Sequence, residues 1–570
     1  KAEPAVVDLA SGDAQTMPGF AADGATAVEW VDDDTLVVLA ATRPAEQVDL
    51  TDEELARRPR VIRGIDYRFN GRGWVHDRRL GVQLVDVASA ERRPVPLPGA
   101  DAVDHRAIAP APDGQSILAV VASDADADLT GGNRVWWLGL DGSSAVCLTP
   151  NGCLWGWVGW TLDGRPLAIG TTSVDRVTFS RPHLLSLDGE SPPQAIGGHD
   201  VNAMALLGNG VAVPVDGALL CAGHRRGAVC IDRYDLDDGS VSTVAGGRLA
   251  VVAFDASADG RRLVAAVSTP TRPAELWEFG DGDGRVVHEL NADVLRELDL
   301  VEPTTISVES ADATSVEGFV YEPPASSRSM GDKRPGLLYV HGGPMFAYGY
   351  AFFDEFQIAA AAGYVVVAGN PRGSDGYGEQ WAASITGRLG TIDFDDVMAL
   401  GGALVAHDDV DSARVGIGGG SYGGFMTAWV IAHADRFAAA LVERAVTNWE
   451  SFEGTSDIGG WFGRQLLGAS TDGEGPNGVE ALRRMSPLSH AAHNRTPTLI
   501  LHAEEDWRCP IEQAEQLFAA YRRHGVDVTF VRVPGENHDL TRGGSPRHRQ
   551  ERFAIIYDFF ADHLGGHRVR

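Results

Sequence analysis

The chain has 570 residues, 44% of them hydrophobic and 22% charged, a composition typical of soluble globular proteins and a length that exceeds one ordinary core. Its net charge of −31 argues against binding to nucleic acid or to anionic membranes, because phosphate groups would be repelled. No apolar run approaches the roughly 20 residues needed to span a bilayer, and the opening KAEPAVVDLASG lacks the features of a signal peptide.

Cysteine usage is sparse. The five cysteines are odd in number, and no two of them form a Cys-x-x-Cys pair. This pattern predicts neither a zinc site nor a disulfide framework. A reducing compartment is the simplest setting for such a chain, so we expect a cytoplasmic protein.

Residues 1 to about 300 contain short β-segments around Asp-Gly turns, such as APAPDGQSILAVVAS and VGWTLDGRPLAIGTTS. Asp-Gly between alternating apolar residues is a strong hairpin signal. A second kind of hairpin recurs with a period of 45 to 50 residues, at Gly142, Gly189, Gly239 and near Gly284. Four short strands per period predict a β-propeller of six to seven blades, of which six can be counted, the first incomplete. An array of β-sandwiches is the alternative. An insertion, residues 45–78, has no role that its sequence indicates.

Beyond residue 300, strands and helices alternate. The segments GLLYV (336–340) and YVVVAGN (364–370) are continuous apolar runs, as in strands buried on both faces. The segments DFDDVMALGGALVAH and RFAIIYDFFADHL carry apolar residues at helical spacing. This alternation predicts a mostly parallel α/β sheet. We therefore expect two domains, residues 1–300 and residues 301–570.

The segment GIGGGSYGGFM (416–426) surrounds Ser421 with glycines and matches the pattern G-x-S-x-G. A predicted strand, RVGIG, precedes the serine, and an apolar helix follows it. In this setting the pattern indicates a nucleophile elbow, a sharp turn that lifts the serine hydroxyl above the sheet. The alternative is a phosphate-binding loop, but the spacing of the known phosphate-binding motifs is absent.

A nucleophilic serine needs a histidine base and an acid that orients it, and in α/β-hydrolases they follow in the order serine, acid, histidine. Asp506 is the predicted acid because it follows the strand TLILH directly, with Glu504 and Glu505 as alternatives. His538, in VPGENHDL, is the predicted base because it follows the strand VTFVRV. The other histidines downstream of Asp506 are His524, His548, His563 and His567. His524 precedes that strand, and His563 and His567 lie on or after the last helix.

The segment HGGP, which begins at His341, follows the strand LLYV. A glycine there allows a backbone N–H to approach a substrate. We predict that the N–H groups of Gly343 and Tyr422 form an oxyanion hole. The alternative is that these glycines only form a tight turn before Pro344.

Together, GGSYGG around Ser421, HGGP, NPRGSDGYG (370–378), Asp506 and His538 resemble the prolyl oligopeptidase family of serine peptidases. The segments VERAVTNWESFEGTSDIG and DWRCPIEQAEQLF most resemble its acylaminoacyl-peptidase branch. The resemblance of the hydrolase region covers roughly residues 305–570, and that of the propeller is one of architecture and of fragments such as RPRVIRGIDYRFNGRG (58–73). It implies an N-terminal β-propeller over a C-terminal α/β-hydrolase fold. Seven blades are usual in this family, and six are counted here.

The resemblance implies that the propeller lies over the catalytic face and admits only short peptides. It also implies that Arg508, two positions after Asp506, binds a backbone carbonyl of the substrate; the alternative is a surface ion pair. No metal or other cofactor is expected. Neither nucleic acid nor a membrane is an expected partner, and a homo-oligomer remains open.

These observations predict a serine peptidase that hydrolyses short peptides, of acylaminoacyl-peptidase or oligopeptidase type. An aminopeptidase or carboxypeptidase of the same family shares the motifs and stays an alternative. An esterase or amidase acting on small acyl substrates would use the same triad. A non-enzymatic propeller scaffold with a relict hydrolase domain is a further alternative, which the intact triad disfavours.

Overall fold

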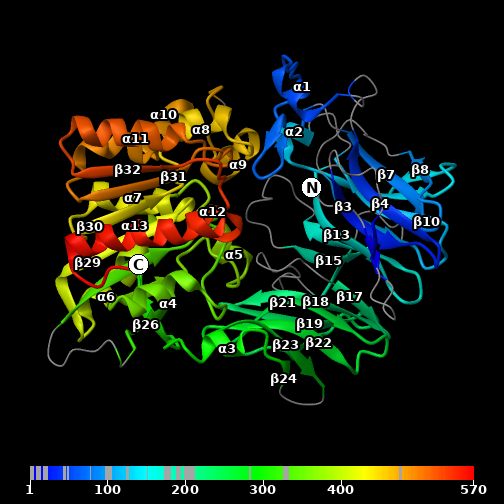
Figure 1. Ribbon diagram of the computed structural model, residues 1–570, viewed down its shortest axis with the longest axis horizontal. Helices are drawn as coiled ribbons and strands as arrows, with labels where there is room; N and C mark the ends of the chain where they lie inside the picture. The colour runs from blue at the N-terminus through cyan, green and yellow to red at the C-terminus, as the bar shows by residue number, and fades with distance from the viewer. Residues whose placement is uncertain are drawn as a thin grey trace.

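The computed structural model describes residues 5–7, 14–16, 24–42, 47, 50–76, 79–96, 105–122, 127–150, 152–171, 182–187, 194–197, 212–280, 284–324, 326, 333–473 and 478–569. They form two regions that lie side by side (Figure 1). The N-terminal region consists of several antiparallel sheets, and the C-terminal region is built on one mixed sheet with helices. This confirms the predicted fold class, a propeller-like region followed by an α/β-hydrolase region. Within the described ranges, no helix is long and apolar enough to cross a membrane.

The described part of the N-terminal region contains five four-stranded antiparallel units. In chain order their strands are β3 (Ala25–Trp30), β4 (Thr35–Thr42), β7 (Arg79–Asp86) and β8 (Arg92–Val95); β9 (His105–Pro110), β10 (Ser116–Val121), β11 (Arg134–Gly139) and β12 (Ala145–Cys147); β13 (Leu154–Trp160), β14 (Pro166–Thr171), β15 (His183–Ser186) and β16 (Gln194–Ile196); β17 (Ala212–Val215), β18 (Ala218–Arg225), β19 (Ala228–Asp235) and β20 (Val241–Ala245); and β21 (Ala250–Ala256), β22 (Leu263–Thr269), β23 (Arg272–Phe279) and β24 (Arg285–His288). One parallel bridge, between Val229 and Ala250, joins the last two units. β1 (Ala5–Val7) and β2 (Ala14–Thr16) form a separate pair.

The Asp-Gly turns lie where the sequence predicts them. Gly114 connects β9 to β10 with a φ of 66°, and Gly142 connects β11 to β12 with a φ of 76°. Glycine adopts this left-handed backbone without the penalty that a Cβ would add. Gly189, expected at a similar turn, lies outside the described residues. The total number of blades stays a prediction.

The insertion, residues 45–78, follows β4 and precedes β7, and it extends away from the first four-stranded unit. It carries α1 (Asp52–Arg57) and a short hairpin of β5 (Arg68–Phe69) and β6 (Gly73–Trp74). The hairpin reaches the C-terminal region, where the Trp74 ring meets the Trp507 ring edge-on at 5.7 Å between centroids. The insertion therefore connects the two regions, which its sequence alone did not indicate.

The C-terminal sheet has eight strands in the order β25-β26-β28-β27-β29-β30-β31-β32. The pairs β25-β26 and β26-β28 are antiparallel, and the others are parallel. The strands are β25 (Thr304–Glu309), β26 (Ser315–Tyr321), β27 (Arg334–Val340), β28 (Val365–Gly369), β29 (Val410–Gly420), β30 (Ala439–Glu443), β31 (Thr498–Ala503) and β32 (Val528–Val533). The two apolar runs predicted as buried strands are β27 and β28, and both are buried almost throughout.

Helices cover both faces of this sheet. α6 (Ile392–Ala406), α7 (Tyr422–His433) and α11 (Glu512–Arg523) share one apolar cluster, and α4 (Asp354–Ala361) and α13 (Pro546–Leu564) share the other. The predicted helices around residues 393–407 and 552–564 correspond to α6 and α13. Shorter helices complete the region: α5 (Glu379–Ala383), α8 (Trp449–Thr455), α9 (Gly459–Leu467), α10 (Gly478–Arg484), the 3₁₀ helix η4 (Pro487–His493) and α12 (Leu540–Gly543).

The chain passes from one region to the other through α3 (Ala292–Leu295), and the mixed sheet begins at Thr304. We therefore propose domain limits near residues 1–300 and 301–570. Away from the insertion, the two regions also meet at a second place. There the buried His224 ring nitrogen Nδ1 lies 3.1 Å from a carboxylate oxygen of Asp375, and the Tyr350 N–H donates to the Gly227 carbonyl at 2.9 Å.

Candidate active site

Ser421 lies between β29 and α7, in the strand–turn–helix setting that the sequence predicts. Its φ of 62° and ψ of −121° are strained for a residue with a side chain. Two neighbouring glycines permit the turn to approach β27. A Cβ built on Gly419 would lie 2.4 Å from the Val340 carbonyl oxygen, and one built on Gly423 would lie 2.0 Å from it. The glycines are therefore a requirement of close packing around the serine.

His538 and Asp506 meet at the ends of neighbouring strands. The His538 Nδ1 lies 2.7 Å from Oδ2 of Asp506. The other oxygen of Asp506 accepts the backbone N–H of Cys509 at 2.8 Å, which fixes the carboxylate. Because Nδ1 of His538 is engaged by Asp506, Nε2 is the nitrogen that remains for proton transfer.

The electrostatics of this pair suit a neutral base beside an ionised acid. Burial lowers the pKa of His538, and the Asp506 carboxylate opposes that effect without cancelling it. Burial disfavours ionisation of Asp506, but His538 and His502 together hold the pKa of that carboxyl well below its usual range. His538 can therefore accept a proton at neutral pH, and Asp506 can stabilise the imidazolium that results.

The alternative acids and histidines lie elsewhere. Glu504 pairs with Arg532 at 2.8 Å on the surface, and Glu505 is exposed. His524 follows α11 at the other end of the neighbouring strand. Among these groups, Asp506 is the acid that contacts His538.

The segment HGGP brings a peptide unit toward Ser421. A Cβ built on Gly342 would lie 3.6 Å from Cβ of Ser421. The buried His341 ring donates from Nδ1 to the Gly342 carbonyl at 2.7 Å. In a trans peptide the C=O and the following N–H point in opposite directions, so His341 orients the Gly343 N–H away from itself. Burial lowers the pKa of His341 to about 4, which keeps the ring neutral.

Tyr422 is the first residue of α7, and the N–H groups of a first helical turn have no partner within the helix. The N–H of Ser421 itself is taken by the Glu443 carbonyl at 3.0 Å. Tyr422 thus supplies a backbone donor next to the serine, and the helix dipole favours negative charge there. This geometry supports the predicted roles of Gly343 and Tyr422.

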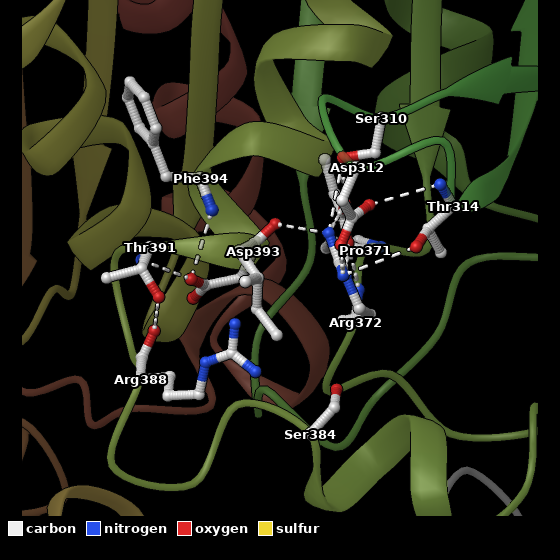
Figure 2. Close-up of polar contacts among 12 residues, drawn as sticks. Ser310, Asp312, Thr314, Pro371, Arg372, Ser384, Arg388, Thr391, Asp393 and Phe394 are labelled. Carbon is white, nitrogen blue, oxygen red and sulfur yellow. Dashed lines mark hydrogen bonds and ion pairs between the residues drawn. The ribbon is translucent and has the colours of Figure 1, made fainter.

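Asp393 belongs to a hydrogen-bonded network that reaches the residue after Ser421, and its contacts with Thr391 and Phe394 are drawn in Figure 2. Asp393, at the start of α6, accepts the N–H groups of Thr391 at 3.0 Å and Phe394 at 3.1 Å. Its second oxygen accepts the Tyr422 hydroxyl at 2.9 Å. Burial raises the pKa of Asp393 to about 6. Asp393 thereby fixes the side chain of the residue whose N–H faces the site.

Arg372, in the segment NPRGS, anchors the loop beside HGGP (Figure 2). Its Nε and Nη2 donate to the two oxygens of the buried Asp396, at 2.9 and 2.6 Å. Its Nη1 donates to Asp312 at 2.5 Å. Ser374, two residues along this loop, contacts the His341 ring at 2.7 Å. The motif residues around 370–378 thus support the histidine that orients the HGGP peptide.

Arg508 forms an ion pair, although not on the surface. Its Nε and Nη2 contact the two oxygens of Asp457 at 2.7 and 3.2 Å, and the Asp457 side chain is fully buried. The guanidinium lies 5.3 Å from the centre of the Phe69 ring, which belongs to the insertion. Within the described residues, the hydrogen bonds of the Arg508 guanidinium come from Nε and Nη2.

One cavity of about 800 Å³ joins these groups. It is lined by Ser421, His538, Gly343, Tyr422 and Arg508. Residues of the N-terminal region complete its wall: Asn70, His224, Gly227 and Val251. The cavity thus lies between the two regions, and all predicted site residues except the buried Asp506 line it.

Sequence reasoning missed several residues that shape the site. Asp393 was visible only as an acidic residue in the first turn of a predicted helix, and Asp457 only as part of a segment used for the family resemblance. Asn70 lies in the insertion, in the segment RFNGRG. None of the three carries a local signal for the contact that ties it to the site, because Tyr422, Arg508 and His538 are distant in sequence from Asp393, Asp457 and Asn70.

The chain is similar in sequence to a peptidase family and to individual peptidases. The sequence profile of the Prolyl oligopeptidase family matches residues 350–567. Over 314 residues the chain is 41% identical to the uncharacterized peptidase YuxL of Bacillus subtilis, covering 55% of this chain and 47% of the relative. It is 31% identical to the acylamino-acid-releasing enzyme of Arabidopsis thaliana over 245 residues, which are 42% of this chain and 32% of that enzyme. The matches thus span less than half the length of these curated relatives.

A solved structure extends the likeness to both regions. The acylaminoacyl peptidase of Pyrococcus horikoshii superimposes with a TM-score of 0.83 and 26% sequence identity. The match covers 98% of this chain and 85% of that one. The family profile begins at residue 350, whereas the structural match covers nearly the whole chain, so the N-terminal region has the arrangement seen in that structure.

Proposed function

The chain belongs to the prolyl oligopeptidase family of serine peptidases, and on this premise we propose that it hydrolyses short peptides through Ser421, His538 and Asp506. The observation that carries the proposal is the contact of 2.7 Å between His538 and Asp506 at a cavity that also holds the strained Ser421.

In the proposed reaction, Oγ of Ser421 attacks the scissile carbonyl while Nε2 of His538 takes its proton. The N–H groups of Gly343 and Tyr422 bind the developing oxyanion. His538 then gives its proton to the leaving amine, and an acyl-enzyme remains on Ser421. Water, activated by His538, hydrolyses this ester by the same route. Asp506 stays ionised throughout.

We propose an acylaminoacyl-peptidase or oligopeptidase type of substrate. The likeness to the Pyrococcus horikoshii acylaminoacyl peptidase over nearly the whole chain supports this class. The cavity wall supplied by the N-terminal region favours short, flexible peptides over folded proteins, since a folded chain could not enter a space between two packed regions. Arg508 is the proposed contact for a substrate carbonyl, because a guanidinium fork binds carbonyl and carboxylate oxygens.

A peptide library tests the proposal directly. Matched peptides with free and with acylated amino termini are digested and analysed by mass spectrometry, with Ser421→Ala as the control. Release of an N-acylated residue from blocked peptides is expected. Release of single residues from free amino or carboxyl termini would instead indicate an aminopeptidase or a carboxypeptidase. Cleavage of small esters without any peptide product would indicate an esterase, and efficient digestion of a folded protein would contradict the size restriction.

A further inference from the structure

The hairpin of β5 and β6 places one side chain of the N-terminal region among the catalytic loops. Asn70, at its tip, is 8% exposed. Its Oδ1 accepts the backbone N–H of His538 at 3.1 Å. Its Nδ2 donates to Asp539 at 3.1 Å, and its backbone N–H donates to Asp457 at 2.9 Å. Three polar atoms of one residue therefore bind two separate segments of the C-terminal region.

Both segments belong to the site. His538 and Asp539 lie in the loop between β32 and α12, where His538 is the proposed base. Asp457 lies between α8 and α9, and its carboxylate also binds the guanidinium of Arg508. The Oδ2 atom of Asp457 is shared, because it accepts both from Asn70 and from Nη2 of Arg508. Asn70 thus contacts the base directly and the proposed substrate-binding arginine through one carboxylate.

The contacts around Asn70 fix the hairpin in this place. Arg68 donates to the Thr455 carbonyl at 2.7 Å. The Trp74 ring packs against Trp507, the residue that follows Asp506, and the Phe69 ring lies beneath the guanidinium of Arg508. The hairpin is therefore seated on the loops of both the acid and the base, and Asn70 itself lines the catalytic cavity.

The bond to His538 N–H has a specific consequence for the imidazole. The side chain of His538 is bonded at Nδ1 to Asp506, but its backbone lies in a loop rather than in a helix or strand. A buried N–H without a partner is disfavoured, so the loop would shift if Asn70 were removed. A displacement of the base by about 1 Å is enough to cost about 100-fold in rate.

We propose that Asn70 is a positioning residue, through which the N-terminal region holds the catalytic histidine in its working place. The inference rests on the proposed function, since it assigns His538 the role of the base. It implies that the catalytic centre of the C-terminal region is complete only when the hairpin of the N-terminal region is seated on it.

The first test measures the reactivity of Ser421 with a fluorophosphonate, a reaction that needs the base but little of the substrate site. We expect Asn70→Ala to be labelled about 100-fold more slowly than the wild type, with its thermal transition nearly unchanged. The matched control is Val61→Ala in the same insertion, because Val61 is 71% exposed, and it should be labelled at the wild-type rate.

The second test uses Asn70→Asp, which keeps an oxygen for the His538 N–H and nearly the same volume. It loses the donor to Asp539 and introduces a negative charge near the imidazole. His538 faces these other charged groups: Asp506, Asp539, Arg444 and Arg508. An added carboxylate stabilises the imidazolium, so the acid limb of the kcat/KM profile should move to higher pH. The acid limb of Asn70→Ala should keep its position.

The outcomes separate the two hypotheses. If the wild type is not labelled at all, the proposed function is wrong, and the proposed role of Asn70 is wrong as well. If the wild type is labelled and Asn70→Ala reacts equally fast, Ser421 is a nucleophile and the positioning role is wrong. If Asn70→Ala is labelled slowly while the acid limb of the kcat/KM profile of Asn70→Asp does not move, Asn70 is only a structural contact, and the inference is wrong.

Discussion

The two regions of the molecule bury their apolar side chains in different ways. In the C-terminal region, two large clusters lie on the two faces of a single sheet, and each is shared by several strands and helices. In the N-terminal region, smaller clusters lie between neighbouring sheets, for example between the second and third units around Trp155 and between the third and fourth around Tyr234. Each N-terminal unit thus depends mainly on its neighbours.

This difference in packing suits the two regions to different roles. A continuous core can hold a strained residue such as Ser421, because many packed groups must move before the turn relaxes. A stack of units coupled only to their neighbours can accept an insertion between two strands without losing the stack. Residues 45–78 use this freedom between β4 and β7. The C-terminal region therefore suits the proposed chemistry, and the N-terminal region can add contacts to it.

The largest expected effect tests whether the chemistry belongs to the C-terminal region alone. Ser421→Ala should lose roughly 10³- to 10⁶-fold in kcat, because the nucleophile is removed. Its thermal unfolding should match that of the wild type, since a smaller side chain fits the turn. Steady-state kinetics on a blocked peptide give the answer. Activity near the wild-type value would show that another residue attacks the substrate.

Asp506→Asn should follow, with a fall in kcat of about four orders of magnitude. The amide cannot stabilise the imidazolium and favours the wrong tautomer of His538. Glu505→Gln, at an exposed neighbour, is the matched control and should keep its activity. A larger loss in the glutamine variant would identify Glu505 as the acid and would contradict the contact between Asp506 and His538.

Asp393→Asn tests the support beneath the elbow. The pKa of folded Asp393 is about 6, against an ordinary value of 3.8, so between these pH values the folded state keeps a proton that the unfolded state releases. Raising the pH through this window therefore destabilises the wild type. Asparagine has no such proton. The variant should gain stability relative to the wild type by up to about 3 kcal/mol between pH 4 and pH 7, measured by denaturant unfolding. A difference that stays constant with pH would contradict the raised pKa.

Arg508→Ala gives the smallest expected effect and bears on the boundary between the regions. Its kcat/KM on peptides should fall by an amount that corresponds to about 1.5 to 3 kcal/mol of transition-state binding, the range for a hydrogen bond to a charged group. A small ester that does not reach Arg508 should be hydrolysed almost normally. Arg508→Lys should recover only part, because an ammonium cannot reproduce the fork. Equal losses on ester and peptide would mean that Arg508 supports the loop of Asp506 instead.

The proposed triad could be assigned from the sequence because its signals are local. Ser421 sits in a glycine-rich segment between a strand and a helix, and Asp506 and His538 each follow an apolar strand. The order of these segments and their positions at strand ends were enough to assign the three residues to one site, and the structure shows the contact between His538 and Asp506. The hairpins of the N-terminal region were equally predictable, since an Asp-Gly turn is recognised from two adjacent residues.

The contacts between the regions could not be predicted in this way. Asn70 has no motif of its own, and its partner His538 is 468 residues further along the chain. Arg508 illustrates the same limit, because the sequence offered substrate binding and a surface ion pair as alternatives, and the structure places an ion pair inside the cavity wall. Contacts of this kind depend on how two folded regions pack, and single-chain patterns carry little information about that packing.

The glycine contact between the regions has a consequence for the size of the cavity. Gly227 and Gly349 meet backbone to backbone, and a Cβ built on Gly349 would lie only 1.8 Å from the Gly227 carbonyl oxygen. Even an alanine at position 349 would therefore force β18 and β19 away from the mixed sheet. Both glycines line the cavity, so its width at this end is set by the approach of two bare backbones. Selection for a wider chamber could act through a single methyl group at this position, without altering any residue that touches the scissile bond.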